Sequence, residues 1–159
     1  MFRISQSLEF DHSAGHVWPY LIAFEQVPLW ERGVLEVRQT TPGAPGLGTE
    51  IVARRQYGGR ESTVAGRIVR WEAGRSAAME LGGGPLSDVV VEYSVDPIDH
   101  RRSLVAYRAE GRLGGALRLL QPLVAALGRR EARRNLASLR ARIDAGIPPR
   151  STATSRGTG

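Results

Sequence analysis

The stretch from Leu113 to Ala145 most constrains the fold, because it predicts one long amphipathic helix. At ~1.5 Å per residue it would be roughly 50 Å long, far longer than an average globular helix. Pro122 lies inside it and predicts a kink, and Gly146 ends it. Such a helix needs a partner, and we expect a curved sheet formed by the preceding residues to wrap around it. Its apolar residues recur at intervals of three and four, which places them on one helical face: Leu113, Leu117, Leu120, Val124, Leu127, Leu136, Leu139 and Ile143.

Alternating apolar and polar residues before this helix predict strands. Phe2 to Phe10 shows the pattern first, and a short helix capped by Ser13 and a turn or second short helix at Glu25 to Glu31 follow. Short connections between the later strands favour antiparallel pairing, and two glycines at 58 and 59 indicate a tight hairpin. Six more strands are expected: Val34–Gln39, Glu50–Tyr57, Ser62–Trp71, Arg75–Leu81, Val89–Val95 and Ser103–Gly111.

Length and composition limit the class of protein. A chain of 159 residues suits one domain, which we place at residues 1–146, followed by a disordered tail at 147–159. The absence of cysteine excludes disulfides and a thiol nucleophile. No apolar run reaches about 18 residues, and the first residues alternate instead of forming a signal peptide. A cytoplasmic location is therefore expected.

The motifs that usually hold a metal or cofactor are missing. Residues 43–48, GAPGLG, lead into a strand instead of a helix, and residues 82–85, GGGP, lack the lysine of a phosphate-binding loop. Asp11, His12 and His16 include a helical pair of histidines, but no third metal ligand is evident. No G-x-S-x-G motif surrounds a serine. We expect no cofactor, no metal and no serine-hydrolase chemistry.

Positive charge is concentrated at the C-terminal end. Residues 112–159 carry 10 arginines against Glu131 and Asp144, and the formal net charge of the whole chain is +6. The basic run of the long helix suggests a nucleic-acid or membrane surface as one alternative. Against it, the other face of the helix is needed for the core, and no aromatic residue beyond Arg108 is available to stack on bases. A solvated helical face is the default interpretation, and a homodimer is left open.

The order of the expected elements resembles that of a known superfamily. Scattered positions carry the likeness: Val17-Trp18, FEQVPLW at 24–30, GVLEV at 33–37, PGLGTE at 45–50, YGGR at 57–60 and EGRLGGALRLLQPL at 110–123. Over roughly residues 2 to 145 the chain resembles the START/Bet v 1-like (SRPBCC) superfamily, in particular its bacterial polyketide cyclase/dehydrase branch. The resemblance implies an α+β helix-grip fold, in which a curved antiparallel sheet of about seven strands wraps around the long helix. Two short helices follow the first strand.

Strand parity selects the candidate site residues. If Ile51 faces the core, then Arg55 and Tyr57 face it too, and a similar argument sends Tyr93 inward. A buried arginine needs a partner, which is either an internal carboxylate or a ligand oxygen. The resemblance implies that a pocket arginine polarises a polyketide carbonyl, and Arg55 is the matching position. Tyr93 either orients a ligand and donates a proton or is simply a core aromatic.

Further residues are expected to line the same cavity. Trp30 is placed at the pocket mouth, and Tyr57, Met79, Tyr107 and Leu120 are candidate wall residues, although core packing is the simpler explanation for several of them. Trp18 is expected to be scaffold.

Two functional hypotheses use the cavity, which lies between the sheet and the long helix. In the first, a binding module holds a small hydrophobic molecule, aromatic polyketide-like or lipid-like. In the second, a polyketide aromatase/cyclase or dehydratase uses Arg55 to stabilise enolate charge and Tyr57 or Tyr93 to relay a proton. No histidine, aspartate or glutamate base is evident for the cavity, which counts against catalysis. The basic helix as an interaction surface is the remaining alternative.

Overall fold

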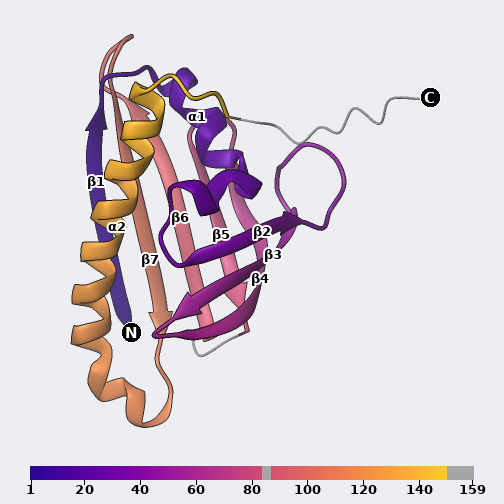
Figure 1. Ribbon diagram of the computed structural model, residues 1–159, viewed down its shortest axis with the longest axis vertical. Coiled ribbons are helices and arrows are strands. Elements are labelled where there is room, and N and C mark those ends of the chain that lie inside the picture. Colours follow the sequence, from indigo (N-terminus) through magenta and orange to yellow (C-terminus); the bar gives the residue numbers. More distant parts are fainter. Residues whose placement is uncertain (84–86, 150–159) are drawn as a thin grey trace.

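The computed structural model describes residues 1–83 and 87–149, with the side chains of these residues apart from Tyr57 and Ser87. Over this part of the chain, one antiparallel sheet of seven strands has the order β1-β7-β6-β5-β4-β3-β2 and curves around a long helix, α2 (Figure 1). The elements are β1 (Phe2–Phe10), α1 (Ala14–Ile22), η1 (Phe24–Leu29), β2 (Val34–Gln39), β3 (Glu50–Tyr57), β4 (Arg60–Glu72), β5 (Ser76–Gly82), β6 (Ser87–Pro97), β7 (Ser103–Arg112), η2 (Gly115–Leu120) and α2 (Gln121–Asp144).

This architecture confirms the expected helix-grip fold. Each predicted strand is present, with ends that differ from the prediction by at most two residues. Gly58 and Gly59 both have positive φ, 52° and 83°, and join the paired residues Tyr57 and Arg60 in a tight turn. Ser13 caps α1 by accepting a hydrogen bond from the His16 backbone N–H at 3.2 Å. Of the predicted tail at 147–159, residues 150–159 lie outside the described residues, as does part of the GGGP segment.

The long helix starts later than the sequence pattern predicted. Gly115 has a φ of 59°, and the residues after it form a 3-10 helix, so α2 begins only at Gln121. Pro122 therefore lies in the first turn of α2, where its missing N–H has no consequence, and the predicted kink is wrong. Gly146 ends the helix with a φ of 70°, as expected.

The buried face of α2 also differs from the predicted one. The face toward the sheet is built from small residues in its first half and large ones in its second: Ala125, Ala132, Asn135, Leu136, Leu139 and Ile143. Gly128 allows the helix to lie close to β1, because a Cβ there would collide with Ile4. Leu117, Leu120 and Leu127 are exposed instead of buried, because the helical phase restarts at Gln121.

The core is divided into clusters. The second half of α2 packs with α1 and the sheet around Phe10, Val17 and Leu139. The first half packs on a smaller cluster near Phe2 and Ile4. These clusters leave the middle of the concave sheet face incompletely filled, which is where the cavities described below lie.

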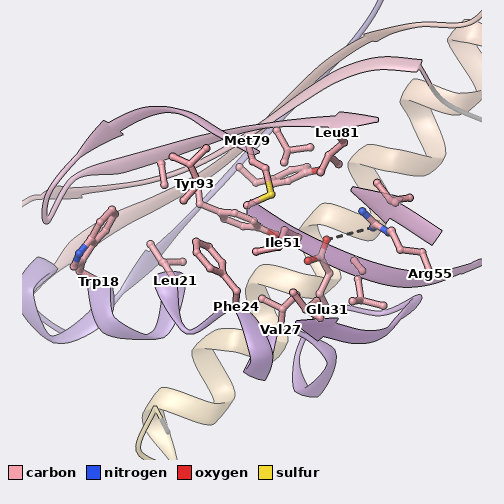
Figure 2. Close-up of a pocket in the computed structure, with 18 residues that line it drawn as sticks. Trp18, Leu21, Phe24, Val27, Glu31, Ile51, Arg55, Met79, Leu81 and Tyr93 are labelled. Atoms are coloured by element: carbon pink, nitrogen blue, oxygen red, sulfur yellow. Dashed lines mark ion pairs between the residues drawn. The ribbon is translucent and has the colours of Figure 1, made fainter. Parts of the chain in front are cut away.

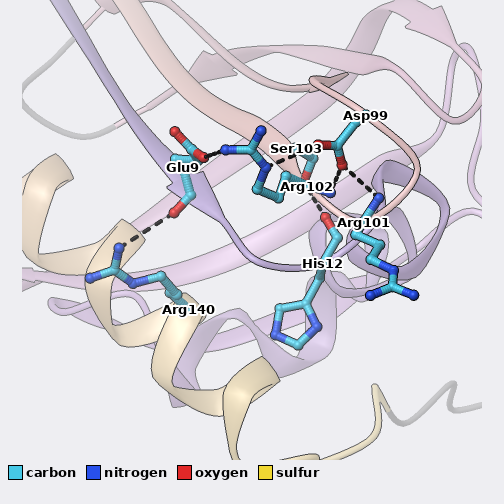
Figure 3. A network of polar contacts seen from close by, with 7 residues as sticks. All are labelled: Glu9, His12, Asp99, Arg101, Arg102, Ser103 and Arg140. Atoms are coloured by element: carbon cyan, nitrogen blue, oxygen red, sulfur yellow. Dashed lines mark hydrogen bonds and ion pairs between the residues drawn. The ribbon is translucent and has the colours of Figure 1, made fainter.

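A polar network closes the end of the molecule near the C-terminus of α2 (Figure 3). Asp99 accepts hydrogen bonds from the backbone N–H groups of Arg101 and Arg102, both at 2.8 Å, and these contacts lower the pKa of Asp99. Arg102 also binds Glu9 at 2.9 Å, and Arg140 reaches the Glu9 carbonyl at 3.4 Å. The network ties β1, the β6–β7 turn and α2 together. No helix in the described residues is long and apolar enough to cross a membrane.

Candidate functional site

One cavity lies under the short helices and is almost entirely apolar. It has a volume of about 90 Å³ and is lined by residues of α1, η1 and strands β2 to β7; we call it the sheet cavity. Figure 2 shows Trp18, Leu21 and Phe24 reaching into it from the helical side and Met79 from the sheet. The sequence places these side chains here because α1 and η1 turn their apolar faces toward the sheet.

A second and larger cavity lies between the sheet and α2. It has a volume of about 370 Å³ and extends along Phe2, Ala109, Val124 and Ala132; we call it the helix cavity. The small side chains of α2 leave this space open, because alanine and glycine cannot reach across to the strands. Its few polar groups lie together near the turn after η1: Glu31, Arg55, Glu131 and Asn135.

The two cavities share a wall that contains an ion pair. Glu31 and Arg55 line both cavities, and Arg55 Nη2 lies 3.5 Å from Glu31 Oε1. Their side chains are only 19% (Arg55) and 11% (Glu31) exposed. Figure 2 shows the carboxylate and the guanidinium facing each other beside the apolar lining. A ligand in either cavity would contact this pair.

Backbone contacts fix the position of Glu31. The Glu31 N–H donates to the Val27 carbonyl at 2.8 Å, which closes the turn after η1. The next residue, Arg32, donates its backbone N–H to Asn135 Oδ1 of α2 at 3.0 Å. The turn is therefore anchored to the long helix, and the carboxylate of Glu31 is held next to the strand that carries Arg55.

The surroundings of Glu31 raise its pKa above the ordinary value. Burial raises the pKa of Glu31, the positive charge of Arg55 opposes this shift, and the nearby Glu131 adds to it. Groups with shifted pKa values often mark functional sites, and Glu31 is such a group in the wall of both cavities.

Tyr93 lies in the sheet cavity beside other aromatic rings. Its ring packs edge-on against Trp30 with centroids 5.6 Å apart and lies 4.9 Å from the ring of Tyr107. Burial, followed by the negative charge of Glu31, raises the pKa of Tyr93 well above its usual value. The hydroxyl is therefore protonated at neutral pH and is able to donate a hydrogen bond.

The structure brings most of the predicted site residues together. Arg55, Tyr93, Met79 and Tyr107 all line the sheet cavity, and Arg55 and Tyr107 also line the helix cavity. Arg55 meets an internal carboxylate, one of the two partners that we considered for it. The side chain of Tyr57 lies outside the described residues.

Two placements need correction. Trp30 is 5% exposed and belongs to the core cluster, where it supports Tyr93, so it does not form the pocket mouth. Leu120 is 45% exposed and lines neither cavity, because η2 turns it outward. Trp18 belongs to the core cluster, as expected of a scaffold residue, and also lines the sheet cavity while packing edge-on against Trp71.

Sequence reasoning missed the acidic residues of the site. Glu31 contradicts the expectation that the cavity has no carboxylate base. It lies in a turn between η1 and β2, where neither strand parity nor helical periodicity reports the direction of a side chain. Its place directly after the apolar segment FEQVPLW was the available signal. Within residues 1–83 and 87–149, no group of three or more potential metal ligands is present.

Comparisons with known proteins agree with the fold and identify the family. The sequence model of a family described as polyketide cyclase / dehydrase and lipid transport matches residues 1–144. A START superfamily protein from Mycobacterium smegmatis has a TM-score of 0.80 at 14% identity, covering 92% of this chain and 100% of that one. The protein TTHA0849 from Thermus thermophilus has a TM-score of 0.77 at 13% identity, with coverage of 92% and 99%.

A third solved structure has an enzymatic title. The Zhui aromatase/cyclase from Streptomyces sp. R1128 has a TM-score of 0.74 at 12% identity, covering 92% of this chain and 95% of that one. At such low identities these likenesses show the fold alone. No curated protein matches the chain at significant similarity.

Proposed function

The chain belongs to the family of polyketide cyclases/dehydrases and lipid-transport proteins, and we propose that it binds a small, largely apolar molecule between the sheet and α2. The molecule is aromatic and polyketide-like or lipid-like. The observation that supports this is the pair of apolar cavities that share the Glu31–Arg55 ion pair as a wall. Such a lining, apolar with a few converging polar groups, is typical of small-molecule sites.

The volumes indicate how such a ligand would lie. The helix cavity, about 370 Å³, is within the range of roughly 300–1,000 Å³ common for ligand pockets. The sheet cavity, about 90 Å³, is too small to hold such a ligand alone. We therefore place the body of the ligand in the helix cavity. Polar oxygens of the ligand would lie beside Arg55 and the hydroxyl of Tyr93, and its apolar body would extend along α2.

Native mass spectrometry of the freshly purified protein tests this binding directly. We expect an apolar adduct of defined stoichiometry that is released on denaturation. Because the ion pair contacts both cavities, the Glu31→Gln/Arg55→Met double variant should lose the adduct. Tyr93→Phe should weaken binding of added 1-anilinonaphthalene-8-sulfonate or palmitate by about three- to tenfold, the usual value of one hydrogen bond.

The outer face of the sheet offers a matched control for the double variant. Arg54 pairs with Glu36 at 3.1 Å on that face, with about half of each side chain exposed. The Glu36→Gln/Arg54→Met variant removes the same two charges without touching either cavity, and we expect it to retain the adduct. A protein that stays free of ligand with all of these compounds would contradict the proposal.

A second candidate function is polyketide aromatase/cyclase or dehydratase activity in the same cavity. The observation that favours it is Glu31, a buried carboxyl group with a raised pKa beside Arg55. Arg55 would hold a ligand carbonyl oxygen while Glu31 removes a proton from the neighbouring carbon. The resulting enolate carbon would attack a second carbonyl of the same chain. The proton returns from Glu31 to the new alkoxide. In the dehydration step Glu31 removes the second proton of the same carbon and passes it to the departing hydroxyl group, which leaves as water.

A synthetic poly-β-ketone separates binding from catalysis. If the protein is a cyclase, cyclised product should form faster than in buffer, and Glu31→Gln should stop this acceleration while the ketone still binds by native mass spectrometry. Product formation at the buffer rate with intact binding would assign the binding function alone.

A further inference from the structure

Five leucines are exposed where η2 meets α2. They are Leu117, Leu119, Leu120, Leu123 and Leu127, with exposed fractions from 44% to 87%. Scattered exposed leucines are normal on soluble proteins, but these five lie within one short segment. Figure 1 shows that η2 and the first turns of α2 form the lower extremity of the molecule, beyond the end of β7. We call these five residues the apolar tip.

Arginines surround the apolar tip without nearby acids in the sequence. Residues 111–130 contain Arg112, Arg118, Arg129 and Arg130 and no aspartate or glutamate. All four arginines are exposed. The flanking acids are Glu110 and Glu131, and Glu110 is already paired with Arg3 at 3.6 Å. The segment is thus both apolar and cationic.

On the outward face of α2, the apolar and the cationic side chains occupy successive parts of the helix. Leu123, Leu127, Arg130 and Arg134 follow each other at intervals of four, three and four, so they lie on one stripe. All four are exposed, and the stripe is opposite the face that carries Ala125 and the other buried residues. Apolar side chains come first, at the extremity, and guanidinium groups follow one turn further from it.

This arrangement complements an anionic lipid bilayer. Leucines at a convex extremity can enter the acyl region without a partner of matching shape, and the arginines behind them would lie at the level of the phosphates. A protein partner would have to present a groove or flat patch that fits the leucines in shape. Nucleic acid has no apolar surface that would accept five leucines. We propose that the apolar tip docks this protein on anionic membrane surfaces.

The docking site adjoins the helix cavity. Leu127 belongs to the apolar tip and also lines the helix cavity, next to Val124 and Gly128. In a protein docked by the apolar tip, the part of the helix cavity near Leu127 would lie at the lipid surface. An apolar molecule could then pass between the cavity and the bilayer. Docking itself does not depend on the proposed ligand, because its residues other than Leu127 lie outside both cavities.

Vesicle flotation with the full chain tests the proposal. We expect binding to vesicles of phosphatidylcholine and phosphatidylglycerol in equal parts, and little binding to phosphatidylcholine alone. Leu119→Gln/Leu123→Gln should weaken binding by about tenfold or more, since two large apolar side chains no longer enter the bilayer. Raising the salt concentration should also weaken it, because the arginines are exposed to screening.

Matched controls use the same chemistry elsewhere on the surface. Leu47 is 71% exposed in the turn before β3, and Arg101 is exposed in the β6–β7 turn. Leu47→Gln and Arg101→Gln should bind vesicles like the wild type, and Arg118→Gln/Arg130→Gln should bind severalfold more weakly. Circular dichroism and binding of 1-anilinonaphthalene-8-sulfonate should be unchanged in Leu119→Gln/Leu123→Gln, which separates docking from the ligand site.

Three results would overturn docking. They are no binding to anionic vesicles, binding that the Leu119→Gln/Leu123→Gln variant retains in full, or equal binding to neutral vesicles. A dimer in light scattering that this variant dissociates, without vesicle binding, would reassign the apolar tip to contact between two copies of the chain. Binding of an acidic protein without vesicle binding would reassign it to a protein partner.

Discussion

Replacement of Arg55 by methionine should lower the free energy of unfolding by about 3 kcal/mol at pH 7. The change leaves the carboxylate of Glu31, whose side chain is 11% exposed, without its countercharge at 3.5 Å. Methionine is about as long as the aliphatic part of arginine and is apolar, so packing is largely retained. The loss of stability therefore reports the unpaired charge of Glu31. Urea unfolding followed by circular dichroism measures it.

The size of this loss should depend on pH. Burial already raises the pKa of Glu31 above its ordinary value of 4.5, and Arg55 is the neighbour that opposes the shift. In the variant the pKa rises further, and Glu131 and the ring of Tyr93 offer no positive charge to replace it. A carboxyl whose folded pKa is raised stabilises the fold below its unfolded pKa, and this stability is lost as pH rises through the folded value. The difference between variant and wild type should therefore be small near pH 4 and large at pH 7.

Two further variants identify the cause. Glu31→Gln/Arg55→Met removes both charges, and most of the lost stability should return. Arg54→Met, one position along β3, removes an arginine from the exposed face and should change the free energy of unfolding by less than about 0.5 kcal/mol. If Arg55→Met were as stable as the wild type at pH 7, the ion pair would not be held in the buried geometry described above.

A buried ion pair in this position points to a role beyond stability. Apolar residues in place of such a pair often give equal or greater stability, because removing charges from water is costly. Here the pair is placed where both cavities meet it, and most of the remaining lining is apolar. A ligand oxygen that approaches Arg55 would take over part of the role of Glu31. Under the proposed function, the two charges would meet the polar group of the ligand.

Strand residues could be placed well from the sequence because their period is short and strict. One assumption, that Ile51 faces inward, put Arg55 in the cavity, and the alternation in β6 did the same for Tyr93. An error of one residue in register would have placed both side chains on the outer face of the sheet. The apolar residues that share a face with them on each strand argue against such an error. The hairpin at Gly58-Gly59 followed from glycine's tolerance of positive φ.

Helix and turn residues were harder to place. The three-and-four spacing of leucines continues from Leu113 through the irregular segment, but the backbone at Gly114 and Gly115 is not helical, so the spacing there has no common face. Leu117, Leu120 and Leu127 of the apolar tip thus looked like core residues. Glu31 lies in a turn whose course is set by packing against α2, and no local pattern encodes such a contact. Local backbone conformation decided the first case and tertiary packing the second.

Filling the helix cavity should abolish ligand binding. Ala109 of β7 is 3% exposed and lines the helix cavity. Its neighbours in the sheet, Ile4 and Val91, are apolar, so a substitution at Ala109 disturbs no ion pair. Ala109→Phe places an aromatic ring in the space of about 370 Å³ that the ligand needs. We expect the affinity for 1-anilinonaphthalene-8-sulfonate to fall by about a hundredfold or more, because a ligand cannot share a close-packed volume with the ring. Fluorescence titration measures the loss.

The same strand offers the control. Ala106 lies three residues earlier on the opposite face of the sheet and lines neither cavity, so Ala106→Phe should bind the probe with wild-type affinity. The cavity has room for the new ring, and Ala109→Phe should therefore unfold within a few degrees of the wild type, in contrast to overpacking of a filled core. Full binding by a folded Ala109→Phe variant would show that the ligand does not lie in the helix cavity. The polar contacts assigned to Glu31 and Arg55 would then have to be met from the sheet cavity, which at about 90 Å³ would have to expand on binding.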